Sequence, residues 1–237
     1  MKKLILFLPL IIFSFLSYAQ VIKEKNATAR PVESFHSIEV SGGFDVYISQ
    51  SDSYALAVSA ATIELRDEIV TKVENGKLII YFNTQNKLLQ KFNNKELKVF
   101  LSAPDIRLIK ASGATDVNIA GSFKAEDIEI NLSGASDLKG EVDINRLSIN
   151  LSGASDVNLS GNVKKLEVNS SGASDFKGKN LNALKCSVEA SGASNVTINV
   201  SEILEPKASG ASHIKYFGNP RVQGLSATGA SKITVAQ

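Results

Sequence analysis

The sequence predicts an all-β solenoid, on the strength of a motif repeated seven times, apolar alternation around each copy, and the absence of proline between Pro104 and Pro206. The motif has the form Ser-Gly-Ala-Ser-Asp and recurs every 18 to 21 residues. Its glycines are Gly113, Gly134, Gly153, Gly172, Gly192, Gly210 and Gly229. A repeat of that length and regularity indicates one structural unit stacked on the next.

Apolar residues occupy every second position on both sides of each motif. Around Gly153 the alternating positions include Ile149, Leu151, Val157 and Leu159. Period two is the pattern of strands with one buried face, whereas a helical repeat would show a period of 3.6 residues. A coil of about 19 residues cannot bury its own apolar face, so successive coils must stack and share a core. The missing proline fits this arrangement, because each ladder position needs its backbone N–H.

Each coil should contain two short strands that meet at the small-residue motif, where glycine allows a tight corner and close stacking. A second turn is expected about eight residues after each motif glycine, near Gly121, Gly140, Gly161 and Gly178. The prediction is a single-stranded parallel β-helix, or β-solenoid, with coils of about 19 residues. The general crossover rule favours right-handed winding.

The N-terminal part of the chain divides into a signal peptide and an irregular cap. Lys2 and Lys3 precede an apolar stretch and small residues, the order of a secretory signal peptide over residues 1–19. The alternative is an uncleaved anchor, but the stretch is shorter than the roughly 20 residues of a membrane span. We therefore expect export to the periplasm, the cell surface or the medium.

Residues 20–100 form the expected cap, and residues 101–237 form the repeats, continuous with the cap as one domain. Residues 41–48 resemble a degenerate early copy of the motif, and residues 73–82 predict a hairpin around Asn75-Gly76. Residues 60–71 fit a short helix or a strand, and the polar residues 83–95 predict a surface loop. No cap is evident after Val235, so the last coil edge should favour pairing with another chain or a second copy.

Charge excludes one class of function. Residues 1–19 hold two of the 26 basic residues and none of the 24 acidic ones, which leaves 24 of each sign in the rest of the chain. Nucleic-acid binding depends on a basic face, so this balance predicts no nucleic-acid partner. The expected partner is a protein or glycan surface, without a stable membrane span.

The exported chain, the early Gly-Gly-Phe-Asp-Val, the Ser-Ala-Pro-Asp-Ile at residues 102–106 and the tandem motif together resemble a known bacterial family. That family is the putative auto-transporter adhesin, head GIN domain. The resemblance covers about residues 35–235. It implies a right-handed β-helix in an exported protein and an adhesive role, and it brings no catalytic residues with it.

The acidic residue of the motif gives the candidate ligand site. Stacked coils would align Asp116, Asp137, Asp156 and Asp175 in one column, continued by Asn195, His213 and Lys232. At about 5 Å, each adjacent pair of carboxylates repels by roughly 0.8 kcal/mol in water. Hydration, the nearby Lys139 and Lys177, or Ca²⁺ would each offset that repulsion. The loss of aspartate in the last three copies argues against an obligatory ion.

No catalytic residues are expected. The serine before each motif aspartate keeps the buried parity, so it should bond within the corner rather than act as a nucleophile. Cys186, the only cysteine, alternates with apolar neighbours and should be a small buried residue. The even spacing leaves no insertion that could form the walls of a polysaccharide-cleaving cleft. The sequence therefore favours a non-enzymatic structural or adhesion module, and the alternative is an envelope protein that binds glycan or Ca²⁺ along the Asp column.

Overall fold

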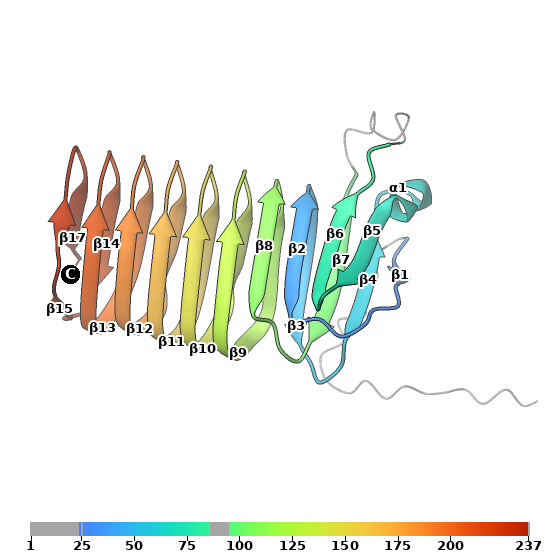
Figure 1. The fold of residues 1–237 in the computed structure, drawn as a ribbon, viewed down its shortest axis with the longest axis horizontal. Coiled ribbons are helices and arrows are strands. Elements are labelled where there is room, and N and C mark those ends of the chain that lie inside the picture. Colours follow the sequence, from blue (N-terminus) through green and yellow to red (C-terminus); the bar gives the residue numbers. More distant parts are fainter. Residues whose placement is uncertain (1–23, 25, 86–94, 237) are drawn as a thin grey trace, which may run out of the picture.

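A computed structural model describes residues 24, 26–85 and 95–236, and it confirms the predicted parallel β-solenoid. Strands stack side by side into an elongated rod, with the N-terminal elements at one end (Figure 1). The expected signal peptide and most of the expected loop at residues 83–95 lie outside the described residues.

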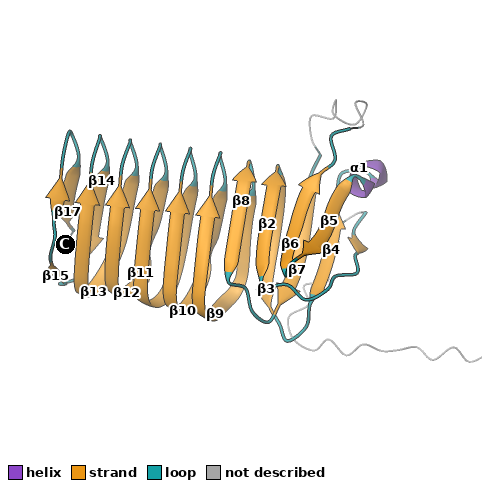
Figure 2. Cartoon of the chain, viewed as in Figure 1, coloured by secondary structure: helices purple, strands orange, loops and turns teal. Residues whose placement is uncertain are grey.

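Five long strands make the regular body of the rod. Each pairs in parallel with the next, and residues in register are about 19 positions apart, as Asp137 and Asp156 are. The motif forms the short connection between successive strands, at one end of every coil (Figure 2). The five strands are β9 (Asp116–Leu132), β10 (Asp137–Leu151), β11 (Asp156–Ser170), β12 (Asp175–Ala190) and β13 (Asn195–Ala208).

The motif turn is built from glycine backbone and a serine hydroxyl. Gly153 has φ +77°, and the next residue, Ala154, donates its N–H to the carbonyl of Gly134 one coil below at 2.7 Å. The Ser155 hydroxyl is buried and donates to the carbonyl of Ser152 at 3.0 Å. The expected buried serine column is therefore confirmed, and its members hold the corner closed.

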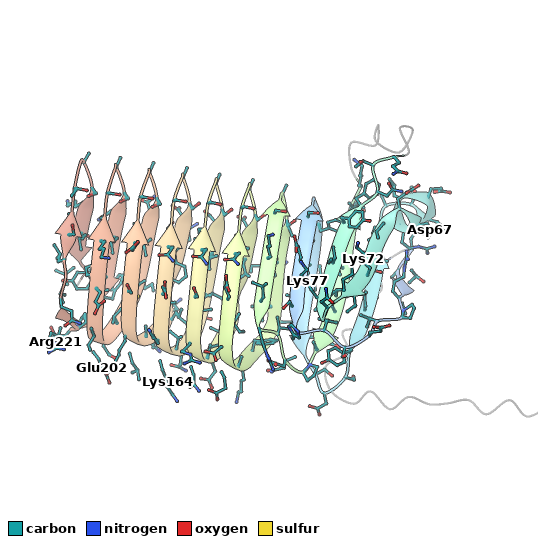
Figure 3. The ribbon with its side chains drawn as sticks, viewed as in Figure 1. Asp67, Lys72, Lys77, Lys164, Glu202 and Arg221 are labelled. Atoms are coloured by element: carbon teal, nitrogen blue, oxygen red, sulfur yellow. The ribbon has the colours of Figure 1, made fainter. Side chains whose placement is uncertain are left out.

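The second corner lies later in the coil than the sequence predicts. In β10 neither Asn145 nor Arg146 is buried. The buried positions are even-numbered up to Ile144 and odd-numbered from Leu147 onward, so the chain turns at this pair. The prediction of a turn near Gly140 is wrong because the strand continues through it. This glycine lies at a register shift instead, where a β-bulge adjusts coils of unequal length. Lys164, Glu202 and Arg221 project from the corner opposite the motif turns (Figure 3).

The early copy of the motif is a true coil, but it lies inside the stack. It consists of β2 (Ser37–Gly42) and β3 (Phe44–Gln50). On one side β2 pairs with β8 (Leu108–Gly113) and β3 pairs with β9. On the other side they pair with β6 (Lys77–Phe82) and β7 (Leu97–Ala103). The early coil therefore lies between β6 and β7 on one side and β8 and β9 on the other.

Antiparallel elements cover the N-terminal end of the rod. These are β1 (Thr28–Ala29), β4 (Ala55–Ser59) and β5 (Ile69–Glu74), of which β4 pairs with β7 and β5 with β6. The hairpin around Asn75-Gly76 is confirmed. The ambiguous segment contains both elements, because α1 (Ile63–Asp67) begins after the N-cap Thr62 and β5 follows it.

Shorter strands form the last coils. They are β14 (His213–Phe217), β15 (Arg221–Val222), β16 (Ser226–Ala227) and β17 (Lys232–Val235). The first three pair with β13, and β17 pairs with β14. Inward residues from every coil join one continuous hydrophobic core that runs along the rod.

Candidate binding surfaces on the solenoid

The register aligns the four motif aspartates in one column. Asp116, Asp137, Asp156 and Asp175 lie opposite one another on successive strands. The structure extends this column beyond the sequence prediction, because Asp45 of β3 lies opposite Asp116 and Lys98 of β7 lies opposite Asp45. The complete Asp column is Lys98, Asp45, Asp116, Asp137, Asp156, Asp175, Asn195, His213 and Lys232. Asp45 follows Gly42 by the same three positions as Asp116 follows Gly113, a signal that the altered motif obscures.

Local partners compensate part of the negative charge in the Asp column. The Lys177 ammonium lies 2.6 Å from an Asp156 carboxylate oxygen and 3.8 Å from one of Asp175. Asn195 donates to Asp175 at 2.9 Å. The centre of the column is less well compensated: partial burial, with Asp116 and Asp156 on either side, raises the pKa of Asp137. Electrostatic strain therefore concentrates at one residue of the column.

The geometry of the Asp column offers one carboxylate per coil in single file. Ca²⁺ requires six to eight oxygen ligands converging from several directions. Among the described residues, no three His, Cys, Asp or Glu side chains converge in a way that could hold a metal ion. A ligand role for Asp116, Asp137, Asp156 and Asp175 stays a prediction.

Residues with catalytic potential are engaged in structural contacts. Cys186 is buried, and this burial raises the pKa of its thiol, which favours the uncharged form. Ser212 is also buried and donates its hydroxyl to backbone carbonyls at 2.8 and 3.0 Å. The ring of His213 bonds to the Thr234 hydroxyl at 2.9 Å.

A shallow groove of about 450 Å³, which the sequence did not predict, runs along the rod beside the motif turns. Lys110 lines one end and Glu189 the other. We call it the Asn–Ser groove, because one wall is an asparagine ladder and the other a row of motif serines. The asparagines are Asn131, Asn150 and Asn169, and the serines are Ser133, Ser152, Ser171 and Ser191. The signal in the sequence is an asparagine two residues before the motif in three successive copies.

Side-chain amides bond to one another along the Asn–Ser groove. Asn150 donates to the Oδ1 of Asn131 at 2.7 Å, and Asn169 donates to the Oδ1 of Asn150 at 3.0 Å. The charged end residues are paired outside this run, Lys110 with Glu39 at 3.2 Å and Glu189 with Lys207 at 2.7 Å. The middle of the groove is therefore polar but uncharged.

A second asparagine ladder lies elsewhere on the coil. Asn182 donates to Asn162 at 3.2 Å, and Asn199 donates to Asn182 at 2.9 Å. These residues precede the second corner and do not line the Asn–Ser groove. The residues that the structure describes thus include two ladders of the same chemistry, of which the first borders the Asn–Ser groove.

The stacked coils, the aligned polar columns and the groove define a tandem-repeat β-solenoid with long, ordered polar surfaces. The family model described as "putative auto-transporter adhesin, head GIN domain" matches residues 34–220. The chain belongs to this family, as its motifs predict, and the family indicates an adhesion-type module of an exported or cell-surface protein. No curated protein matches the sequence.

Solved structures share the fold. A putative adhesin from Bacteroides fragilis is 22% identical, with a TM-score of 0.78 over 89% of this chain and 96% of that one. A putative lipid binding protein from Parabacteroides distasonis is 21% identical, with a TM-score of 0.69 over 89% and 96%. A putative adhesin from Parabacteroides merdae is 16% identical, with a TM-score of 0.67 over 89% and 95%. At these identities the likeness establishes the solenoid fold alone.

The part of the chain that the structure describes contains no helix long and apolar enough to cross a membrane.

Proposed function

We propose that this protein is a non-enzymatic adhesion module, which binds a partner along the polar surface of its solenoid. The Asn–Ser groove is the observation that carries the proposal. It spans five successive coils and is lined by repeated uncharged hydrogen-bonding groups. An extended surface of this kind suits recognition of an extended partner, because each coil adds one similar contact.

The protein's own chemistry supports binding without turnover. General acid–base catalysis needs a positioned acid and base, and a nucleophile needs an adjacent base. Cys186 and Ser212 are buried, and His213 is bonded to Thr234. The walls of the groove carry amides and hydroxyls, which bind and orient a partner but have no pKa suited to proton transfer near neutrality.

The alternative function is calcium or glycan binding along the Asp column. The raised pKa of Asp137 supports this alternative. Excess negative charge at Asp137 is what a bound cation would relieve. Lys177 already supplies that relief to Asp156 and Asp175, which is why the Asn–Ser groove is the stronger candidate.

The test is a binding screen of residues 20–237 against an array of glycans and matrix proteins, with calcium and with chelator. We expect saturable binding that is independent of calcium and survives simultaneous Asp→Asn changes at positions 116, 137, 156 and 175. Binding that disappears with chelator or with those changes would move the site to the Asp column. A chain that binds nothing on the array would contradict the adhesion role.

A further inference from the structure

The Asn–Ser groove combines two walls whose free hydrogen-bonding groups are complementary. A side-chain amide carries two N–H donors and an oxygen with two lone pairs. Asn150 uses one donor toward Asn131 and one lone pair toward Asn169. One N–H and one lone pair of Asn150 therefore remain for a ligand, and the ladder holds the amide plane in position to present them.

The serine wall offers mainly acceptors. Ser171 donates its hydroxyl to the Leu151 carbonyl at 3.0 Å, and Ser152 donates to the Leu132 carbonyl at 3.4 Å. A hydroxyl whose proton is engaged in this way keeps its oxygen lone pairs for a ligand. A ligand between the walls thus meets donors and acceptors on the asparagine side, and acceptors at Ser152 and Ser171 on the serine side. Hydroxyl groups, which both donate and accept, fit this arrangement.

The spacing along the groove favours a sugar chain over a peptide. Coils repeat at about 4.8 Å, and the five coils from Lys110 to Ser191 span about 19 Å. An extended peptide repeats its side-chain direction about every 6.7 Å, so its groups fall out of step with the coils. A β-1,4-linked chain of pyranose rings advances one ring over nearly the length of one coil. Because alternate rings are turned over, the same ring edge returns at every second coil, so the chain stays in step with the groove.

The charge of the groove favours a neutral ligand over an acidic one. The middle of the Asn–Ser groove has no ionised side chain, and the end residues Lys110 and Glu189 are already paired with Glu39 and Lys207. An acidic polymer would lose hydration without gaining a counter-charge. A neutral polymer incurs no such cost.

From these contacts we infer that the Asn–Ser groove binds a neutral β-1,4-linked glycan lying along the solenoid axis, with about one ring per coil. This inference rests on the proposed adhesion function and names the ligand class of the same surface. The asparagine ladder positions the rings, and the serine row accepts their hydroxyl protons.

Calorimetric titration of residues 20–237 with neutral β-1,4-linked oligosaccharides of two to six rings tests the inference. Affinity should rise with each ring and level off at about five, the number of coils lining the groove. Matched β-1,4-linked oligouronates should bind at least about tenfold more weakly. Asn150→Ala removes the central amide and should weaken binding about tenfold. Asn182→Ala, in the second ladder, is the matched control and should leave binding unchanged.

Several results would overturn the glycan inference. They are affinity that does not depend on ring number, equal weakening by Asn182→Ala, no binding of any neutral oligosaccharide, or tighter binding of an extended polar peptide. The array separates these results from failure of the proposed function. If Asn150→Ala leaves binding on the array intact, the glycan inference is contradicted and the adhesion proposal stands. If nothing on the array binds, both are contradicted.

Discussion

At Asp137 the repeat lowers the stability of the folded protein. Identical coils bring identical side chains together, so the Asp column places like charges about 4.8 Å apart. The flanking carboxylates of Asp116 and Asp156, together with partial burial, raise the pKa of Asp137. A carboxyl whose pKa is raised on folding is costly when ionised. The stability present below the ordinary carboxyl pKa is therefore lost as pH rises through the raised value.

Asp137→Asn should stabilise the protein at neutral pH. Two neighbours at about 4.8 Å repel by roughly 0.9 kcal/mol each in water, and screening at physiological salt reduces the total to about 1 kcal/mol. We expect the free energy of unfolding to rise by about that amount at pH 7, and to change little at about pH 3, where carboxyls are protonated in both states. Denaturant titrations at the two pH values measure the difference.

Asp156→Asn is the matched control for this prediction. It removes the same charge from the same column, but it also removes the partner of Lys177 at 2.6 Å. We therefore expect no gain in stability at pH 7. An equal gain from Asp137→Asn at both pH values would contradict the electrostatic explanation.

At the scale of the element, the motif turn depends on backbone contact between coils. An ideal Cβ at Gly153 would lie 2.5 Å from the carbonyl oxygen of Gly134, and φ is +77°. A methyl group there meets both a steric clash and an unfavourable backbone region. The repeated glycine is consequently required by stacking as well as by the turn.

Gly153→Ala should lower the free energy of unfolding by about 3 kcal/mol or more. Gly224→Ala is the control, because Gly224 also has positive φ (+62°) but has nothing within 4 Å of its ideal Cβ. It should cost only about 1 kcal/mol, the backbone contribution alone. Chemical denaturation followed by circular dichroism compares the two, and equal losses would mean that stacking does not constrain the turn.

The repeated elements were predictable because their information is local. Period two identifies the strands within a single copy, and the spacing of the seven copies and the missing proline identify the coil and its motif turn. The sequence predicts the second corner at the wrong place because glycine, as at Gly140, is a common turn residue. The observed corner is at Asn145-Arg146, where the alternation of buried positions shifts by one residue. The Asn–Ser groove was not predicted because its walls form only when residues from five coils lie in register.

The strand pairings of the cap could not be predicted from the sequence, because they connect residues that are distant in the sequence. No local pattern indicates that β2 has β6 on one side and β8 on the other. Residues 51–103 lack the motif, so nothing in their spacing shows that β4, α1 and β5 lie outside the parallel stack while β6 and β7 belong to it.

At the scale of the whole molecule, a solenoid should tolerate loss of a complete coil. Deleting residues 156–174 joins Ser155 to Asp175 and recreates the motif, with Asp175 opposite Asp137. We expect a folded rod one coil shorter, less stable by about 1–3 kcal/mol for the 19 residues lost. Far-ultraviolet circular dichroism and thermal melting measure the outcome.

Deleting only residues 156–164 is the control, because a partial coil cannot restore the register with its neighbours. This variant should fail to fold cooperatively. If both deletions melt alike, the coils are not the independent units that the repeat implies.

The inserted position of β2 and β3 has a consequence for the order in which the chain folds. Ser41 and Ser112 pair although 71 positions separate them, whereas Asp137 and Asp156 are only 19 positions apart. Closing the longer loop costs about 1.2 kcal/mol more in chain entropy. The early coil also remains uncovered on both sides until β6 and β8 reach it. We therefore expect the cap to assemble more slowly than a regular coil, which closes by short-range pairing.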